Sequence, residues 1–167
     1  MIRARRTALL AAVTILIGVL LSGCSLGGHP ATPPAPQPEA RSMETVEAAV
    51  DDIPGVRFTA ARAWDGTTSY VTATLSASDT FEGDPAALID YALGQLASQT
   101  EIDRGRLVRF TFDAPGQTVD TTQALLASLD IASERYADGS SLELSSSDLD
   151  RRYGTWPAPA PERPPTL

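Results

Sequence analysis

The sequence predicts one α+β domain, a two-layer sandwich in which a mostly antiparallel sheet of about five strands carries helices on one face. Three observations predict this class. Ten of the 13 prolines lie near the two ends of the chain, which leaves the segment 43–156 to fold. Within it, runs with apolar residues at helical spacing are interleaved with runs in which every second residue is apolar. The order of these runs is α-β-β-α-β-α-β-β. A segment of this length supports a single core and excludes two tandem domains and a multi-span membrane protein.

The first half of the domain is expected to contain a helix, a hairpin and a second helix. A helix over 44–52 ends at Pro54-Gly55. The first strand then points Val56, Phe58, Ala60 and Trp64 to one face, and Asp65-Gly66 is a hairpin signal. On the returning strand the apolar face consists of Val71, Ala73, Leu75 and Ala77. Asp84 followed by Pro85 is a strong helix start, and this helix has a wide apolar face: Leu88, Ile89, Ala92, Leu93 and Leu96.

The second half is expected to add a strand, a short helix, a second hairpin and a last short helix. Val108, Phe110 and Phe112 form the inward face of the third strand. Asp120 is expected to cap a short helix, and Asp138-Gly139 marks the second hairpin. Ser145 with Asp148 three residues later starts the last helix. The pairs Asp52-Ile53 and Asp130-Ile131, each followed by a hairpin, suggest a weak internal repeat.

The N-terminus has the features of an export signal. Arg3, Arg5 and Arg6 precede an uncharged, mostly apolar run, 7–21, which is shorter than the roughly 20 residues of a membrane-spanning helix. The run ends in Leu21-Ser22-Gly23-Cys24. These four residues match the lipobox, so the leader resembles the signal peptide of bacterial lipoproteins. The resemblance implies signal-peptidase recognition of Leu21, Ser22 and Gly23, cleavage before Cys24 and attachment of a diacylglyceryl group to its thiol. An uncleaved signal-anchor helix is the alternative.

The expected organisation is therefore a signal peptide over 1–23, a lipidated Cys24 with a proline-rich linker to residue 42, the domain over 43–156, and a disordered proline-rich tail over 157–167. Five prolines in the linker favour an extended chain that reaches about 55 Å. Without the three leader arginines the chain keeps 10 basic and 21 acidic residues, a net charge of −11. Such a surface repels nucleic acid and anionic headgroups, so we expect no nucleic-acid partner and membrane contact only through the lipid.

The composition excludes several chemistries. The sequence contains neither Lys nor Asn, its one His is His29, and its one Cys is Cys24. Schiff-base chemistry, a P-loop, a Ser-His-Asp site and a zinc cluster each require residues that the segment 43–156 lacks. Asp79, Glu82 and Asp84 lie close together in the sequence, but their spacing does not match a calcium loop. We therefore expect no metal, no cofactor and no catalytic residue.

One sheet face is the candidate binding surface. If the helices cover the opposite face, this one presents Arg57, Tyr70 and Arg109, together with several threonines and Glu143. Arg supplies planar donors and Tyr a stacking surface, which suits an anionic or sugar-like ligand. The same composition also fits an ordinary solvated face, because Thr and Tyr favour strands.

Together these features predict a non-catalytic, membrane-anchored protein of the cell envelope, on the extracytoplasmic side, whose small acidic domain binds a protein or an envelope polymer. The alternative is a carboxylate-dependent hydrolase acting on cell-wall glycans. A third hypothesis is a domain that functions inside a complex through an exposed sheet edge. A hydrolase requires two acids that converge in a concave site, whereas a binding module requires a flat or edge-strand surface.

Overall fold

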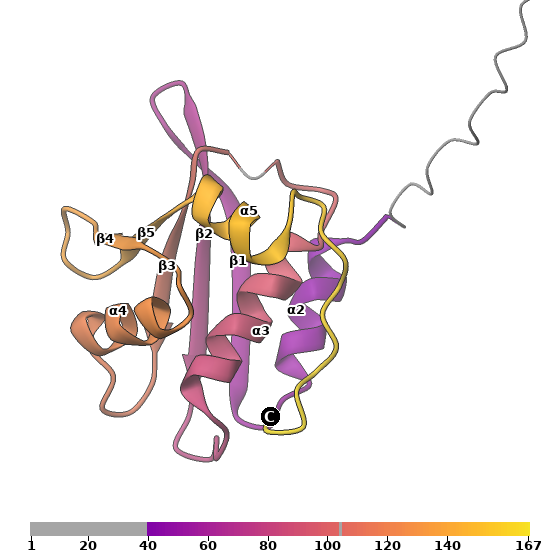
Figure 1. Ribbon diagram of the computed structural model, residues 1–167, viewed down its shortest axis with the longest axis vertical. Coiled ribbons are helices and arrows are strands. Elements are labelled where there is room, and N and C mark those ends of the chain that lie inside the picture. Colours follow the sequence, from indigo (N-terminus) through magenta and orange to yellow (C-terminus); the bar gives the residue numbers. More distant parts are fainter. Residues whose placement is uncertain (1–39, 104) are drawn as a thin grey trace, which may run out of the picture. The chain divides into compact units, whose positions relative to one another are not determined.

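The computed structural model describes residues 40–103 and 105–167, which contain four helices and five strands. The elements are α2 (Met43–Asp51), β1 (Val56–Asp65), β2 (Thr68–Ala77), α3 (Pro85–Ala97), β3 (Leu107–Asp113), α4 (Val119–Ser128), β4 (Ser133–Arg135), β5 (Leu142–Ser145) and α5 (Ser146–Tyr153) (Figure 1). The class is α+β, as predicted. The predicted order holds as far as β5, and α5 extends it. The order α-β-β-α occurs on each side of β3.

The strands form one open sheet in the order β1-β2-β3-β5-β4. The prediction of a mostly antiparallel sheet is corrected to a mixed sheet, because β2 and β3 run parallel, from the pair Val71–Val108 to the pair Ser76–Asp113. The pairs β1–β2, β3–β5 and β4–β5 are antiparallel. Parallel neighbours need a long connection, which α3 supplies. Alternation of apolar residues along a strand does not reveal which strand lies beside it.

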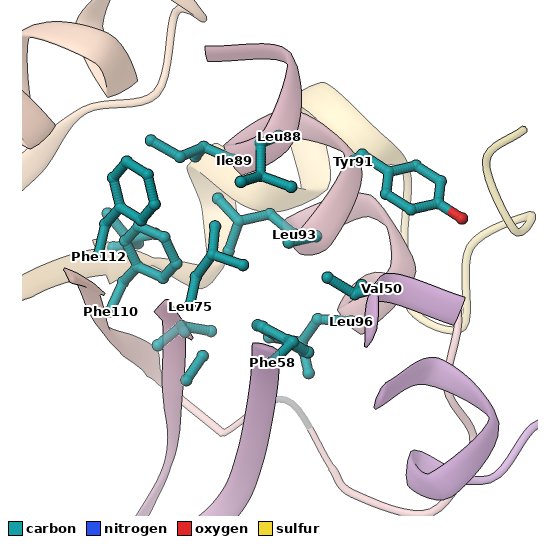
Figure 2. Packing of buried hydrophobic residues seen from close by; sticks show 14 of the residues in the cluster. Val50, Phe58, Leu75, Leu88, Ile89, Tyr91, Leu93, Leu96, Phe110 and Phe112 are labelled. Carbon is teal, nitrogen blue, oxygen red and sulfur yellow. The ribbon is translucent and has the colours of Figure 1, made fainter. Parts of the chain in front are cut away.

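The core lies between the sheet and the helices. From the strands, Phe58, Leu75 and Phe110 point inward at the positions that the sequence predicts. From α3, Leu88, Leu93 and Leu96 are fully buried against them, as Figure 2 shows. Both Ile53 and Ile131, the isoleucines of the suggested repeat, are 1% exposed. Complete burial of such side chains stabilises the fold by roughly 1.5–3 kcal/mol each.

The helix starts follow local capping chemistry. Asp84 accepts a hydrogen bond from the backbone nitrogen of Ala86 at 2.9 Å, and Pro85 opens α3, as predicted. Ser145 caps α5, also as predicted. The expected cap of α4 is corrected: Thr118, not Asp120, is the N-cap, because Thr118 and Thr121 exchange side-chain to backbone hydrogen bonds in a capping box. Asp120 lies in the first turn instead.

Strand β1 extends past the helices that cover its first half. Its residues are buried on alternate positions at Val56 and Phe58, but both Arg62 and Trp64 are exposed. The expectation that Trp64 points into the core is therefore wrong. Figure 1 shows the turn between β1 and β2 projecting beyond α2 and α3. The alternating pattern is correct for the strand, but no helix lies opposite its second half.

The C-terminal tail, residues 155–167, packs on the domain, which corrects the expectation of a disordered segment. It runs past α3 and α2 (Figure 1). The backbone nitrogen of Ala158 donates to the carbonyl of Ala97 at 2.8 Å, and Ala158 is 5% exposed. Trp156 and Leu167 pack against the core. Proline-rich chain loses little backbone entropy on ordering, so these few contacts are sufficient to hold it.

Candidate functional site

The open face of the sheet carries the three predicted binding residues, but it brings only two of them together. Arg109 of β3 lies opposite Thr72 of β2, and its guanidinium carbon is 4.4 Å from the centre of the Tyr70 ring. Arg57 lies opposite Ser76, at the other end of the sheet. There its NH1 is 2.9 Å from Oδ2 of Asp51, and its side chain is 76% exposed. The predicted face is therefore divided into two separate regions.

Arg109 is enclosed by its neighbours. Its guanidinium carbon lies 3.4 Å from the centre of the Tyr136 ring, and Tyr70 lies against it as well. NH1 of Arg109 donates to the hydroxyl of Tyr70 at 3.2 Å, and NH2 is 3.5 Å from Oε1 of Glu143. Only 17% of the Arg109 side chain is exposed. We call Tyr70, Arg109, Tyr136 and Glu143 the arginine cluster.

The contribution of Tyr136 is not evident from the sequence, because this residue lies between β4 and β5 rather than on a strand. Its backbone nitrogen donates to the carbonyl of Ser141 at 2.9 Å, which fixes the turn around Gly139. In the same turn, the backbone nitrogen of Ser140 donates to Asp138 and lowers the pKa of its carboxyl, with a further contribution from the charge of Arg109. Tyr136 lies two residues before the Asp138-Gly139 turn, and an aromatic residue at that position is the signal that sequence reasoning overlooked.

The arrangement of the cluster favours a structural role. Aromatic rings cover the Arg109 guanidinium, and the Glu143 carboxylate lies beside it. NH1 and NH2 of Arg109 already face Tyr70 and Glu143, and its Nε is buried, so the cluster is a poor binding site for an anion. It joins β2, β3 and the β4–β5 turn through one cation.

A more accessible feature is the outer edge of β1. The backbone nitrogen of Ser78 donates to the carbonyl of Gly55. The backbone N–H and C=O groups of odd-numbered β1 residues therefore point toward β2, and those of even-numbered residues point outward. Two of the outward N–H groups are occupied by α2. The nitrogen of Phe58 donates to Oδ1 of Asp51 at 2.7 Å, and that of Ala60 donates to Oε1 of Glu47 at 3.0 Å.

The second half of that edge is uncovered. The outward backbone groups of Arg62 and Trp64 have no hydrogen-bond partner among the described residues. Among the large hydrophobic side chains of the described residues, that of Trp64 is exposed, with 62% of its surface accessible to solvent. Free strand edges are sites where another chain adds main-chain hydrogen bonds. We call the uncovered backbone of residues 61–65, with the Trp64 side chain, the open β1 edge.

The opposite edge of the sheet is protected. Strand β4 is only three residues long. The amide nitrogen of Gln123, on α4, donates to the carbonyl of Ser133 at 2.9 Å, and Arg135 pairs with Asp120. Short length and side-chain cover are the usual ways in which edge strands are blocked. Among the described residues, β1 leaves a longer stretch of edge backbone uncovered than β4 does.

Two hollows border the sheet. One, of about 710 Å³, lies where β1 begins and β2 and β3 end, with Asp51, Arg57 and Asp113 in its wall. The other, of about 550 Å³, is lined by Glu134, Glu143 and Asp148 among others. Glu134 and Glu143 are direct cross-strand partners. Glu143 is paired with Arg109, while Asp148 is paired with Arg151 and bonded to the Ser145 hydroxyl.

No group of three or more His, Cys, Asp or Glu side chains in residues 40–103 and 105–167 is arranged to hold a metal ion. Asp84, one of the three acids considered for calcium, caps α3. Leu21, Ser22, Gly23 and Cys24, the predicted processing and lipidation residues, lie outside the described residues. Among the helices that are described, none is long and apolar enough to cross a membrane.

Comparison with protein-family models, with curated proteins and with solved structures returns no match for this chain.

Proposed function

We propose that this chain is a lipid-anchored protein of the bacterial cell envelope, facing the extracytoplasmic side, and that its domain binds a partner without catalysing a reaction. The anchor is inferred from Leu21-Ser22-Gly23-Cys24 and the arginine-led apolar run before it. Two acyl chains hold a protein stably at a membrane, because each buried methylene contributes about 0.8 kcal/mol. The proline-rich linker then separates the domain from the headgroups.

The observation that carries the binding proposal is the open β1 edge. The first half of this strand is covered by Glu47 and Asp51, whereas the second half offers unpaired main-chain groups beside an exposed Trp64. Main-chain pairing at an edge provides affinity, and a neighbouring aromatic side chain adds an anchor. Only a polypeptide supplies N–H and C=O groups at strand spacing. We therefore favour an extended protein segment over an envelope polymer as the partner.

The test separates the backbone from the side chains. Arg62→Pro removes one outward N–H group, and because this group faces away from β2, the ladder between the strands is kept. Arg62→Ala is the matched control, since it removes the side chain and keeps the N–H group. Trp64→Glu removes the aromatic anchor. Crosslinking in the native envelope, followed by mass spectrometry, compares the partners of the four full-length proteins.

The proposal expects a partner that is captured by the parent chain and by Arg62→Ala but lost with Arg62→Pro and with Trp64→Glu. Capture that is unchanged by both of the latter substitutions would show that the edge is not the binding surface. The anchor is tested separately by Cys24→Ser, which should leave the leader uncleaved and the lipid absent. Processing at the same bond in this variant would refute the lipoprotein assignment.

The hydrolase alternative has one supporting observation, the hollow lined by Glu134, Glu143 and Asp148. It is the weaker candidate because the second and third of these carboxylates already have Arg partners. Release of reducing sugar from purified cell-wall glycan by the parent chain, and its loss in Glu134→Gln, would favour this alternative over the binding proposal.

A further inference from the structure

Residues 157–162 of the tail are held through the backbone and the Pro161 ring, and side chains on either side of this segment, such as Trp156 and Leu167, pack against the core. The carbonyl of Pro161 accepts a hydrogen bond from Nε2 of Gln95 at 3.1 Å, and the nitrogen of Ala158 donates to the carbonyl of Ala97 at 2.8 Å. Farther along, Arg163 lies 3.4 Å from Asp52. Most of these contacts depend on the extended backbone of the tail rather than on a particular side chain. A different segment with the same proline spacing therefore satisfies the same partners.

A glycine makes room for the proline ring. A Cβ atom at Gly94 would lie 3.1 Å from Cγ of Pro161 and 3.4 Å from Cδ1 of Tyr153. The ring of Pro161 thus fits where α3 has no side chain, beside the Tyr153 ring of α5. Grooves lined by aromatic residues are a common means of binding proline-rich segments, because such segments are already extended before they bind. We call Gly94, Gln95, Ala97 and Tyr153 the tail-binding surface.

The chain contains a second segment that differs from the bound one at a single position. Residues 157–162 read Pro-Ala-Pro-Ala-Pro-Glu, and residues 34–39 read Pro-Ala-Pro-Gln-Pro-Glu. The first copy lies in the expected linker and outside the described residues. The one difference places Gln37 against Ala160, which is exposed, so the longer side chain has room in solvent. The buried Ala158 and the ring-inserting Pro161 have identical counterparts in Ala35 and Pro38.

We propose that the tail-binding surface also binds residues 34–39 of a second copy of this chain, in exchange for its own tail. Chain direction favours a second copy over the same molecule. The tail passes Ala97 first and Gln95 afterwards, so it moves away from the C-terminal end of α3. The described chain begins at that same end, because the backbone of Arg41 is bonded to Thr100. Within one molecule the linker would have to lie in the reverse direction.

Exchange of this kind joins one molecule's linker to another molecule's domain. Reciprocal exchange between two copies closes a symmetric dimer, and exchange that continues from copy to copy generates chains or rings. Confinement of anchored copies to one membrane raises their effective concentration and strengthens a weak contact. The binding step itself does not depend on the open β1 edge or on the lipid. Its test can therefore fail or succeed independently of the proposed function.

The experiment uses the chain from residue 24 with Cys24→Ser and Trp64→Phe, which leaves Trp156 as the only tryptophan. Trp156 begins the tail and packs against the core, so its fluorescence reports release of the tail. A synthetic peptide of residues 30–41 is titrated into this chain and into the same chain with Pro161→Ser, which weakens the tail. A peptide with Pro36→Ser and Pro38→Ser is the matched control.

We expect the 30–41 peptide to bind the Pro161→Ser chain at least tenfold more tightly than the parent, and the control peptide to bind at least tenfold more weakly. Adding Gly94→Leu should lower the affinity at least tenfold. This substitution fills the space of the proline ring while it favours the helix, and circular dichroism checks the fold. Sedimentation velocity should show concentration-dependent association of the Pro161→Ser chain, which the two linker substitutions abolish.

Three results would overturn the proposal. In the first, a peptide of residues 156–167 binds the Pro161→Ser chain while the 30–41 peptide does not, so the surface accepts only the tail. In the second, neither peptide binds, so the tail cannot be exchanged between molecules. In the third, the 30–41 peptide binds but Gly94→Leu leaves its affinity unchanged, which places the binding site elsewhere.

Discussion

Replacing Arg109 tests whether the arginine cluster supports the fold or serves a ligand. Arg109→Ala removes two cation–π contacts, at 4.4 and 3.4 Å. It also leaves Glu143, which lies opposite Glu134, without its Arg partner. Each cation–π contact contributes about 0.5–2 kcal/mol, depending on how far it is removed from water. The Arg109 side chain is 17% exposed, so the upper part of this range applies.

We therefore expect Arg109→Ala to lower the free energy of unfolding by about 2–3 kcal/mol. For a domain of this size the corresponding fall in Tm is roughly 8–12 °C. Arg109→Lys should lose about half of this, because an ammonium group keeps the charge but does not stack as a flat guanidinium does. Urea unfolding monitored by circular dichroism measures all three proteins under identical conditions.

Arg57→Ala is the matched control, since its ion pair with Asp51 is largely exposed and should contribute no more than about 0.5 kcal/mol. Tyr136→Phe is a second control that keeps the aromatic ring. If Arg109→Ala and Arg57→Ala lower stability by the same small amount, the cluster is not a structural element. Enclosure of the Arg109 guanidinium would then add no more stability than the exposed Arg57 pair does.

Three further predictions follow from the core, the edge and the tail-facing tyrosine. Phe110→Ala, at a fully buried position, should cost about 3–5 kcal/mol by urea unfolding, and a loss below 1 kcal/mol would contradict the described core. Asp51→Ala should lower the free energy of unfolding by about 1–3 kcal/mol, because it leaves the Phe58 nitrogen without an acceptor. Asp52→Ala should have little effect, and equal losses of stability in the two variants would argue that α2 does not cover the β1 edge. Burial, and then the adjacent Asp90, raises the pKa of Tyr153 well above its ordinary value, so the folded protein keeps a proton that the unfolded chain loses. Stability should therefore fall as the pH rises past about 10, and Tyr153→Phe should reduce that fall between about pH 9.5 and 11.5. An identical pH dependence in the parent and in Tyr153→Phe would contradict this assignment.

Features with a local cause were predictable from the sequence. Asp84-Pro85 and Ser145 start helices because their side chains cap the next few backbone nitrogens. Phe58 and Phe110 are buried because alternation along a strand places them on the helix side. The turn at Gly66 follows from its positive φ of 59°, which glycine adopts without strain.

Features that depend on distant parts of the chain were not predictable. The parallel contact of β2 with β3 depends on how α3 crosses the sheet, and the capture of Arg109 by Tyr136 depends on a turn about 30 residues away. Composition alone also misjudged the tail, because proline content says nothing about Trp156, Ala158 and Gly94 meeting on one surface. For the candidate site, the sequence placed Tyr70, Arg109 and Glu143 on one face but did not identify Tyr136, whose ring covers the guanidinium.

The parallel pairing of β2 and β3 also sets the sequence of events by which the molecule assembles. Each hairpin closes through a short turn, whereas the middle seam of the sheet joins strands separated by the 29 residues 78–106. Closing so long a segment is entropically slower than closing a turn. An unfolded chain would therefore form its two hairpins early and place β3 between them late, once α3 has crossed the sheet. Until β2 and β3 pair, their facing edges remain accessible to proteases and to other unfolded chains.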